Sequence, residues 1–265
     1  MQFLYHDKDL AVILKPVGLD SESAVPAAII AELGGECYPI HRLDLNVGGV
    51  MVYARTKQAA AALSKAVQEG SMVKEYIALV HGLPEETGDW SDLLLKDARK
   101  NKVFVVDRPR KGVKDARLTY QRLSGSDPAL VRIRLYTGRS HQIRVQFASR
   151  KHPLVGDHKY GARDTHAAPM LYSCCLTFPW KGQSLRFEHL PAWADAERLN
   201  RIAAMEAAFD RHAPEDMPIL IAYLEGLWKA DYEADDQGLI PRCMKRGVLS
   251  QDGLYNLVTD WEAQQ

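Results

Sequence analysis

Two short segments carry side chains that could do chemistry together. The sequence HRLD at 41–44 places Asp44 at the mouth of a Gly-rich turn, and TGRSHQIR at 137–144 ends in Arg144. A guanidinium can hold a carboxylate through two parallel hydrogen bonds, which favours the ionised form and fixes its direction. A carboxylate with such a partner, and with no metal ligands nearby, is suited to attack on carbon. We therefore predict that Asp44 is a nucleophile held by Arg144, although an isolated Asp or Arg is more often solvated.

The elements expected to position these groups follow from hydrophobic periodicity and turn signals. Residues 130–136 alternate between apolar and polar side chains, which predicts a strand. Residues 24–33 predict a short helix that ends at a Gly-Gly pair. Thr56 and Ser140 are predicted to cap two further helices. Residues 84–115 are polar and are predicted to form an irregular loop. Other strands are predicted at 10–14, 50–54, 74–82, 116–123, 171–178 and 184–188.

The charge is segregated along the chain even though its formal net value is zero. Residues 96–122 contain ten Lys and Arg against three Asp and Glu, whereas residues 195–236 contain four against eleven. A basic body followed by an acidic tail could bind a phosphate backbone through the body alone. The basic run is predicted to be an extended loop that grips phosphates, and the alternative is an ordinary solvated loop.

The composition argues against several classes of protein. No stretch resembles a signal peptide or a membrane span, so no membrane partner is predicted. The four cysteines form no C-x-x-C pair, which argues against a disulfide framework or a zinc site and favours the cytoplasm. The chain has no phosphate-binding loop and no dinucleotide fingerprint. His41 and Asp44 alone would make a poor metal site. We therefore predict no metal and no organic cofactor.

Three blocks of sequence resemble a known family in order, spacing and composition. HRLDLNVGGVMVYART, KEYIALVHG and LYTGRSHQIRVQFASRKHPLVGDHKYG are similar to the signature blocks of the RluA-type RNA pseudouridine synthases. The resemblance implies an α+β pseudouridine synthase fold, with a mixed, mainly antiparallel central sheet and flanking helices. It ends near residues 188–193. We therefore expect a catalytic domain at 1–194 and an acidic, mostly helical C-terminal extension of unknown role at 195–265.

The resemblance also implies an activity and three catalytic residues. Family members isomerise uridine in RNA by breaking the N1–C1′ bond, turning the base and joining C5 to C1′. Asp44 would be the nucleophile, at the ribose C1′ or the pyrimidine C6, or would assist elimination at the sugar, and the sequence does not choose among these routes. Arg144 would be its partner. Tyr76 would stack on the uracil and accept a proton, whereas periodicity alone indicates a core tyrosine.

Further residues are implied to contact RNA or shape the pocket. Arg42 would help to extrude the target base and fill its place, although a phosphate contact or a solvated side chain fits the sequence equally well. Lys74 shares a strand face with Tyr76, and its alternative role is a charge at a strand edge. Lys15 belongs to a KPVGL block that would form a pocket wall. The other members of this predicted set are His41, Arg139 and His141.

The chain departs from the family pattern in three places. Val47-Gly48-Gly49 replaces the usual Thr-Ser-Gly, and Gln146 stands where a His is usual. The sequence also opens directly in the catalytic body, so an N-terminal S4 RNA-binding module is not expected. None of these departures removes a proposed reacting group, so activity is expected to be retained.

The expected partner is structured RNA, ribosomal or transfer, bound by a monomer. The extension would pack on the body, cover a sheet edge or recruit a protein partner. Two alternative functions remain: a catalytically silent RNA-binding protein that keeps the fold, and a hydrolase in which Asp44 attacks a sugar. Glycosidases normally need a second carboxylate, and Asp157, the candidate for it, lies in a segment predicted to be a structural turn.

Overall fold

The structure is a computed structural model that describes residues 1–125 and 127–196. Met1–Leu123 and Asp127–Ala194 form one compact unit, which contains every element named below. The mostly helical extension predicted at 195–265 lies almost wholly outside the described residues.

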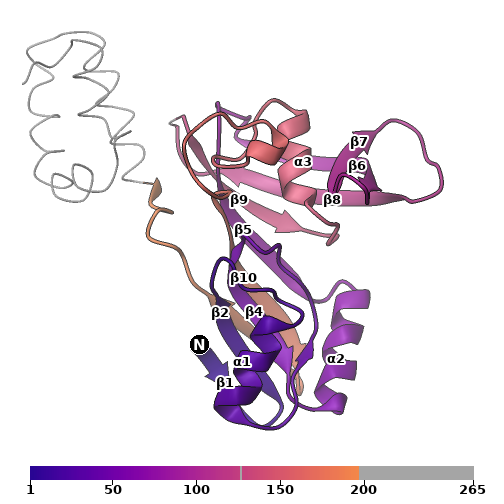
Figure 1. The fold of residues 1–265 in the computed structure, drawn as a ribbon, viewed down its shortest axis with the longest axis vertical. Helices are drawn as coiled ribbons and strands as arrows, with labels where there is room; N and C mark the ends of the chain where they lie inside the picture. The colour runs from indigo at the N-terminus through magenta and orange to yellow at the C-terminus, as the bar shows by residue number, and fades with distance from the viewer. Residues whose placement is uncertain (126, 197–265) are drawn as a thin grey trace, which may run out of the picture. The chain divides into compact units, whose positions relative to one another are not determined.

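Eleven strands of this unit form one mixed sheet, flanked by three α-helices (Figure 1). The strands are β1 (Gln2–His6), β2 (Leu10–Lys15), β3 (Tyr38–Pro39), β4 (Gly48–Ala54), β5 (Val73–Val80), β6 (Thr87–Asp97), β7 (Lys102–Val106), β8 (Val113–Arg122), β9 (Ala129–Leu135), β10 (Leu171–Trp180) and β11 (Gln183–Glu188). The helices are α1 (Ala24–Leu33), α2 (Lys57–Gln68), α3 (Gln142–Ser149) and the 3-10 turn η1 (His158–Tyr160).

The order of strands across the sheet is β1-β2-β4-β10-β5-β9-β8-β6-β7, with β3 beside β4 and β11 beside β10. In the described residues, β4 and β10 pair in parallel and the other neighbours are antiparallel. The predicted α+β class and the mixed, mainly antiparallel sheet are therefore confirmed. The strands predicted at 10–14, 50–54, 74–82, 116–123, 130–136, 171–178 and 184–188, and the helix predicted at 24–33, are present to within a few residues.

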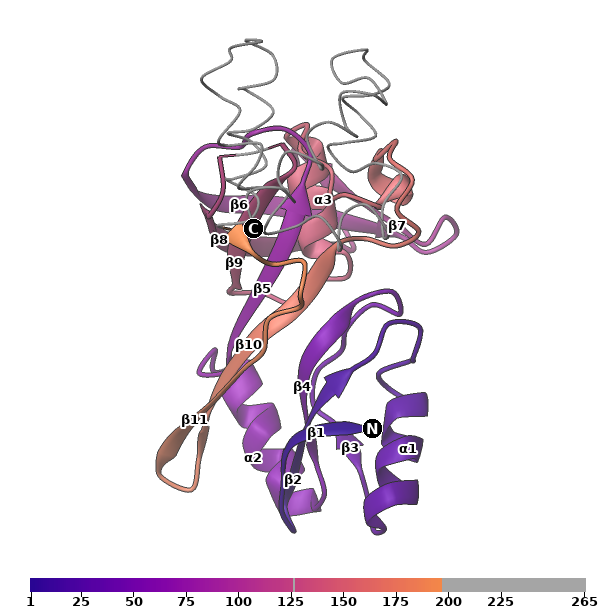
Figure 2. The same cartoon turned by 90° about the vertical axis from the view of Figure 1, so that its left-hand side faces the viewer.

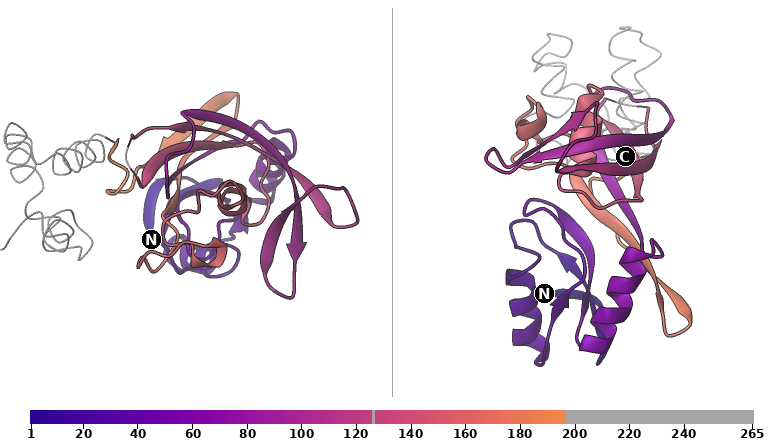
Figure 3. Two further views of the ribbon diagram at one scale, coloured as in Figure 1. Left: turned by 90° about the horizontal axis from the view of Figure 1, so that it is seen from above. Right: turned by 90° about the vertical axis from the view of Figure 1, so that its right-hand side faces the viewer.

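The helices divide between the two faces of the sheet. Ile29 of α1 packs in the same core cluster as Ile13 of β2, whereas Leu63 of α2 packs with Val12 in a second cluster. Neighbouring side chains of a strand point to opposite faces, so α1 and α2 cover opposite faces of this part of the sheet. Phe147 of α3 belongs to the same cluster as α1. The curved strands partly enclose α3 (Figure 3).

The two predicted helix caps have different outcomes. The Thr56 side chain accepts a hydrogen bond from the Ala59 N–H at 3.2 Å, so the predicted cap of α2 is confirmed. The prediction that Ser140 caps the third helix is wrong. His141 occupies the N-cap position of α3 in a left-handed conformation (φ 50°), without a side-chain cap. The Gln142 side chain instead closes the preceding turn, because its Oε1 accepts the Arg139 N–H at 3.0 Å.

The prediction of an irregular loop at 84–115 is also wrong, because β6, β7 and the start of β8 occupy most of this segment. Trp90, Asp92 and Leu94 lie two residues apart on β6, and therefore share one face. The middle residue is acidic, and its carboxylate is paired with Arg150 rather than exposed to solvent. This polar residue on the inward face interrupts the apolar alternation by which the strand would have been predicted.

β5 and β10 run from the part of the sheet that holds α1 and α2 to the part that holds α3 (Figure 2). β10 joins β4 through a short parallel pairing in which Ser173 lies opposite Gly49. A Cβ at Gly49, whose φ is 126°, would lie 2.3 Å from the Ser173 carbonyl oxygen. Only glycine permits this approach, so Gly49, the position at which this chain keeps the Gly of the usual Thr-Ser-Gly, is required for packing.

Candidate active site

The three predicted catalytic side chains reach one cavity from three separate elements. Asp44 lies in the loop between β3 and β4, Tyr76 on β5, and Arg144 on α3. All three line a cavity of about 450 Å³. This volume is within the range of about 300–1,000 Å³ that is typical of pockets for small ligands.

Arg144 connects two carboxylates. Its Nη1 donates to Asp44 Oδ2 at 3.0 Å. Its Nε and Nη2 donate to Asp157 Oδ2 and Oδ1, at 2.7 and 2.8 Å. The predicted contact between Arg144 and Asp44 is therefore present, but the prediction that it is a pair of parallel hydrogen bonds is wrong. The two-pronged interaction belongs to Asp157, and Asp44 accepts a hydrogen bond from Nη1 alone.

Burial increases from Asp44 and Arg144, which line the cavity, to Asp157, which lies behind them and does not line it. The side chains of Asp44, Arg144 and Asp157 are 23%, 10% and 1% exposed. Burial alone would lower the pKa of Arg144, but the hydrogen bonds and charge of Asp157, with a further contribution from Asp44, raise it above its ordinary value. Arg144 is thus a permanent cation, with one carboxylate to neutralise it and another to be oriented by it.

The backbone on either side of Asp44 is fixed by hydrogen bonds. The Ser21 hydroxyl donates to the Leu43 carbonyl at 3.1 Å, and the Val47 N–H donates to the Asp44 carbonyl at 3.0 Å. Leu43 and Val47 are both buried in the core cluster. The carboxylate therefore projects from a turn that is anchored at both ends.

The Lys15 side chain also fixes this turn. Its ammonium donates to the carbonyl oxygens of Pro16, Leu45 and Val47, at 3.0, 3.3 and 2.8 Å. The residue is only 2% exposed, and burial lowers its pKa to about 8. Lys15 was predicted to contact RNA or shape the pocket wall, and it does not line the cavity in the described chain. In this structure it positions the loop that carries Asp44.

His141 lies beside the Asp44 carboxylate. Its Nε2 is 3.9 Å from Asp44 Oδ2, and its Nδ1 is 2.9 Å from the Tyr160 hydroxyl. That hydroxyl accepts the Val103 N–H, so it can donate its own proton to Nδ1. This arrangement favours the tautomer with the His141 proton on Nε2, directed toward Asp44. Burial lowers the pKa of His141, which favours the neutral ring.

His41 and Lys74 form another part of the cavity wall. His41 Nε2 accepts the Val52 N–H at 3.3 Å, while burial and the charge of Lys74 lower the pKa of His41 to about 3. Burial also lowers the pKa of Lys74. Lys74 lies on the central strand β5, so the alternative of a charge at a sheet edge is wrong.

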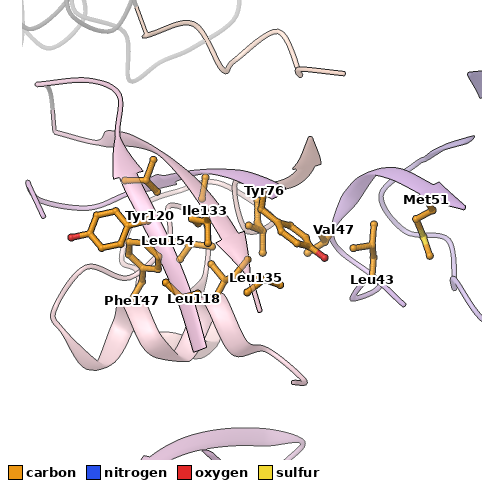
Figure 4. Packing of buried hydrophobic residues seen from close by; sticks show 14 of the residues in the cluster. Leu43, Val47, Met51, Tyr76, Leu118, Tyr120, Ile133, Leu135, Phe147 and Leu154 are labelled. Carbon is orange, nitrogen blue, oxygen red and sulfur yellow. The ribbon is translucent and has the colours of Figure 1, made fainter. Parts of the chain in front are cut away.

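Tyr76 lies between the two groups of core residues shown in Figure 4, with its hydroxyl directed toward Val47. It is 6% exposed and also lines the cavity. Burial and, secondarily, the charge of Asp44 raise the pKa of Tyr76, so its phenol is protonated at neutral pH. The ring is a flat apolar wall with a polar tip.

Arg42 and Arg139 lie at the rim of the cavity and do not contact Asp44. Arg42 pairs with Glu22 at 2.8 Å, and both side chains are more than half exposed. The Arg139 Nε donates to the Asp115 carbonyl at 2.8 Å. Both guanidiniums remain accessible for a ligand that enters the cavity.

Two residues of the site were missed in the sequence, Asp157 and Tyr160. Both lie in the segment HPLVGDHKYG, which was interpreted as structural turns. Tyr160 contacts His141 through its hydroxyl, and its ring lies 5.2 Å from the Arg144 guanidinium carbon. The available signal was an acid, Asp157, that lies only 13 residues after Arg144 in the same signature block.

In the described part of the chain, no three His, Cys, Asp or Glu side chains converge as metal ligands would. Among the same residues, no helix has the length and apolar character needed to cross a bilayer.

We expect Asp157→Asn to destabilise the protein by about 3–5 kcal/mol, because it leaves the buried Arg144 charge without its principal partner. Urea denaturation of the full chain would measure this change. Asp89→Asn is the matched control, since Asp89 makes the same two-pronged contact with Arg117 on the exposed surface. The control should cost far less, because an exposed ion pair contributes little to stability. Equal losses for the two variants would contradict the role given to Asp157.

Lys15 should give the folded protein a characteristic pH dependence. Its pKa falls from 10.5 to about 8 on folding, so between these values the unfolded chain binds the extra proton. The free energy of unfolding of the wild type, relative to Lys15→Met, should therefore rise from pH 8 to pH 10.5, by up to about 3 kcal/mol. Parallel stability curves for the two proteins, measured by urea denaturation across this range, would show that Lys15 is not held as described.

The chain matches two known family profiles. Residues 9–149 match the family profile described as RNA pseudouridylate synthase. Residues 197–263 match a second profile, a domain of unknown function designated DUF4298.

Several bacterial proteins are similar to the chain. An RNA pseudouridine synthase of Aquifex aeolicus is 34% identical over 195 residues, which cover 65% of this chain and 60% of that protein. The ribosomal large subunit pseudouridine synthase C of Buchnera aphidicola is 34% identical over 63% of this chain and 56% of its own length. The chain thus spans somewhat under two thirds of these two relatives. The dual-specificity RNA pseudouridine synthase RluA of Yersinia pestis is 31% identical over 71% of this chain and 98% of its own length.

Two solved human structures share the fold. RNA pseudouridylate synthase domain containing 4 superposes with a TM-score of 0.63 and 25% identity, over 73% of this chain and 90% of that one. Domain containing 1 gives a TM-score of 0.65 at 23% identity, over 74% and 86% of the two chains. The matching profile, these relatives and the shared fold show that the chain belongs to the RluA-type family of RNA pseudouridine synthases.

Proposed function

We propose that this protein isomerises uridine to pseudouridine in structured RNA, ribosomal or transfer, acting as a monomer with Asp44 as the nucleophile. The observation that carries the proposal is the contact between Arg144 and Asp44 in a cavity that Tyr76 also lines. The name of the Buchnera relative, which refers to the ribosomal large subunit, favours ribosomal RNA. The cysteines Cys37, Cys174 and Cys175 are free thiols, which is compatible with a reducing cytoplasm.

The reaction breaks the N1–C1′ bond, rotates the freed uracil and forms a C5–C1′ bond. Asp44 would attack C1′ or C6, or assist elimination at the sugar. Each route uses an ionised carboxylate aimed at the nucleotide, and the Arg144 Nη1–H favours that form by donating a hydrogen bond to it. The neutral His141 ring, with its Nε2 facing the same carboxylate, would help to keep bulk water away.

The target base must leave its stack to reach the cavity. The Tyr76 ring would then pack against the uracil, and its hydroxyl would take part in proton transfer. Its raised pKa means that accepting a proton would require release of its own. Arg42 at the rim would fill the place of the extruded base. The cations and rings along the wall would contact the nucleotide, namely His41, Lys74, Arg139 and His141.

The basic residues between 96 and 114 would bind phosphates from strands and from the turns that join them. They lie on β6, β7, β8 and their turns, and β7 is an edge strand of the sheet. Lys102 lies 5.3 Å from the centre of the Tyr160 ring, which also touches His141. A phosphate backbone bound here would thus approach the residues around Asp44.

We further propose that 1–194 is the catalytic domain and that 195–265 is a separate extension, which would pack on the body or recruit a protein partner. Support comes from the match of 197–263 to a different family profile. Limited proteolysis with mass spectrometry should give its first cuts near residue 195 and leave 1–194 intact. Early cuts within the catalytic domain would argue against this division.

Asp44→Asn should abolish release of tritium from RNA labelled at C5 of uridine, because the amide cannot act as the nucleophile. The substrate would be total RNA from cells that lack the gene, so that the target uridine is unmodified. RNA affinity should stay within a few-fold of the wild type, since the change alters little volume. Asp9→Asn is the control, because Asp9 pairs with Lys181 and does not line the cavity. It should keep full activity.

The same assay separates the alternatives. A catalytically silent RNA-binding protein would bind RNA and release no tritium in its wild-type form. A sugar hydrolase with two carboxylates is disfavoured, because Asp157 is 1% exposed and both its oxygens are held by Arg144. Mapping pseudouridines in RNA from cells with and without the gene would identify the target.

A further inference from the structure

An exposed aromatic side chain stands at the rim of the cavity, just before the TGRSHQIR segment. Tyr136 follows β9 and lines the cavity, yet it is 45% exposed. No hydrogen bond of its hydroxyl occurs within the described residues, so no polar contact of that group inside the protein accounts for its position. A large exposed ring beside a functional cavity is a candidate for ligand contact.

Two guanidiniums flank the ring. The Arg117 guanidinium lies 4.7 Å and that of Arg134 5.2 Å from the ring centre. The Tyr136 N–H donates to the Arg117 carbonyl at 3.1 Å, which fixes the backbone beneath the ring. We call Arg117, Tyr136 and Arg134 the Tyr136 platform.

Hydrogen bonds hold part of the Tyr136 platform in place. Arg117 donates to Asp89 through Nε and Nη2 at 3.0 and 2.7 Å, which fixes the plane of its guanidinium. A ring and a guanidinium held in this way lose little side-chain freedom when a ligand binds. The surface is therefore suited to stacking, which needs a flat and stationary partner.

Charge indicates what the ligand would be. Arg117 is neutralised by Asp89, whereas Arg134 makes no ion pair within the described residues. An aromatic or guanidinium plane stacks on nucleobases, and an unpaired guanidinium binds phosphate. A nucleotide offers both groups, and an RNA whose uridine enters the cavity must place a neighbouring nucleotide at the rim.

We propose that the Tyr136 platform binds an unpaired nucleotide adjacent to the target uridine, with its base stacked on the platform and its phosphate paired with Arg134. This inference rests on the proposed function and deepens it. Tyr136 would help to determine which sequence context or which loop of RNA is accepted, because a neighbour locked in a duplex could not stack there.

The test uses a synthetic RNA that spans the mapped uridine, and the full-length protein carrying Asp44→Asn so that the RNA is not turned over. Fluorescence anisotropy would measure affinity with and without Tyr136→Ala. Loss of one stacking contact should weaken binding roughly 10- to 100-fold, and Tyr136→Phe should restore it to within a few-fold. Tyr5→Ala is the matched control, because Tyr5 on β1 is 37% exposed but does not line the cavity. The control should bind like the parent.

A second arm needs no change in the protein. Two RNAs would each carry one abasic nucleotide, on the 5′ side of the uridine in one and on the 3′ side in the other. One of them should bind the parent protein about as weakly as the Tyr136→Ala variant binds the intact RNA. Combining that RNA with Tyr136→Ala should cause no further loss, since both changes remove the same contact. Arg134→Gln should make the fall of log affinity with log salt less steep, by about 0.7–0.9 in the slope, because one phosphate contact is lost.

The outcomes separate this inference from the proposed function. If the wild type releases tritium and Tyr136→Ala binds as tightly as its parent, or if the abasic and alanine effects add fully, the platform does not hold a neighbouring nucleotide. If the wild type modifies no RNA, the proposed function fails and this inference fails with it.

Discussion

The arrangement of the site depends on the buried pair between Arg144 and Asp157. A guanidinium has three nitrogens in a rigid plane, and two of them are committed to Asp157 at 2.7 and 2.8 Å. The direction of the third, which meets Asp44 at 3.0 Å, is then no longer free. Burying two charges carries a large desolvation penalty, which this pair offsets by matching both oxygens with N–H donors. The result is a fixed donor at the floor of the cavity, aimed at a more exposed carboxylate.

The opposite side of this contact is fixed by the main chain. The turn that carries Asp44 is held by the Ser21 hydroxyl, by its own hydrogen bond to Val47 and by the Lys15 ammonium. None of these contacts uses the carboxylate itself. Asp44 is therefore positioned without its oxygens being consumed, and only one of its oxygens is hydrogen-bonded by Arg144. Such preorganisation lets a reacting group meet its substrate with little rearrangement.

The sequence predicted the parts of this protein in which local pattern and burial agree. The strands at 10–14 and 130–136 and the Thr56 cap are examples, because each depends on residues close together in the chain. The strand containing Asp92 was missed because an inward-facing acid is compensated by Arg150, a partner 58 residues away. Asp157 was missed for the same reason, since a turn residue becomes part of a site only through a contact that one-dimensional pattern does not show. Ser140 has the residue type of a cap, but a left-handed His141 takes that position.

The short parallel pairing between β4 and β10 has a mechanical consequence. Asp44 precedes β4, whereas Tyr76 belongs to β5, and β10 separates these two strands. The parallel pairing that joins β4 to β10 spans only Gly48 opposite Tyr172 and Gly49 opposite Ser173. Displacement of Asp44 relative to Tyr76 is thus resisted by only two residue pairs between β4 and β10. Gly49 adds no side chain to this joint. A ligand that contacts both Asp44 and Tyr76 would bridge this short pairing, so its binding should stiffen the sheet there.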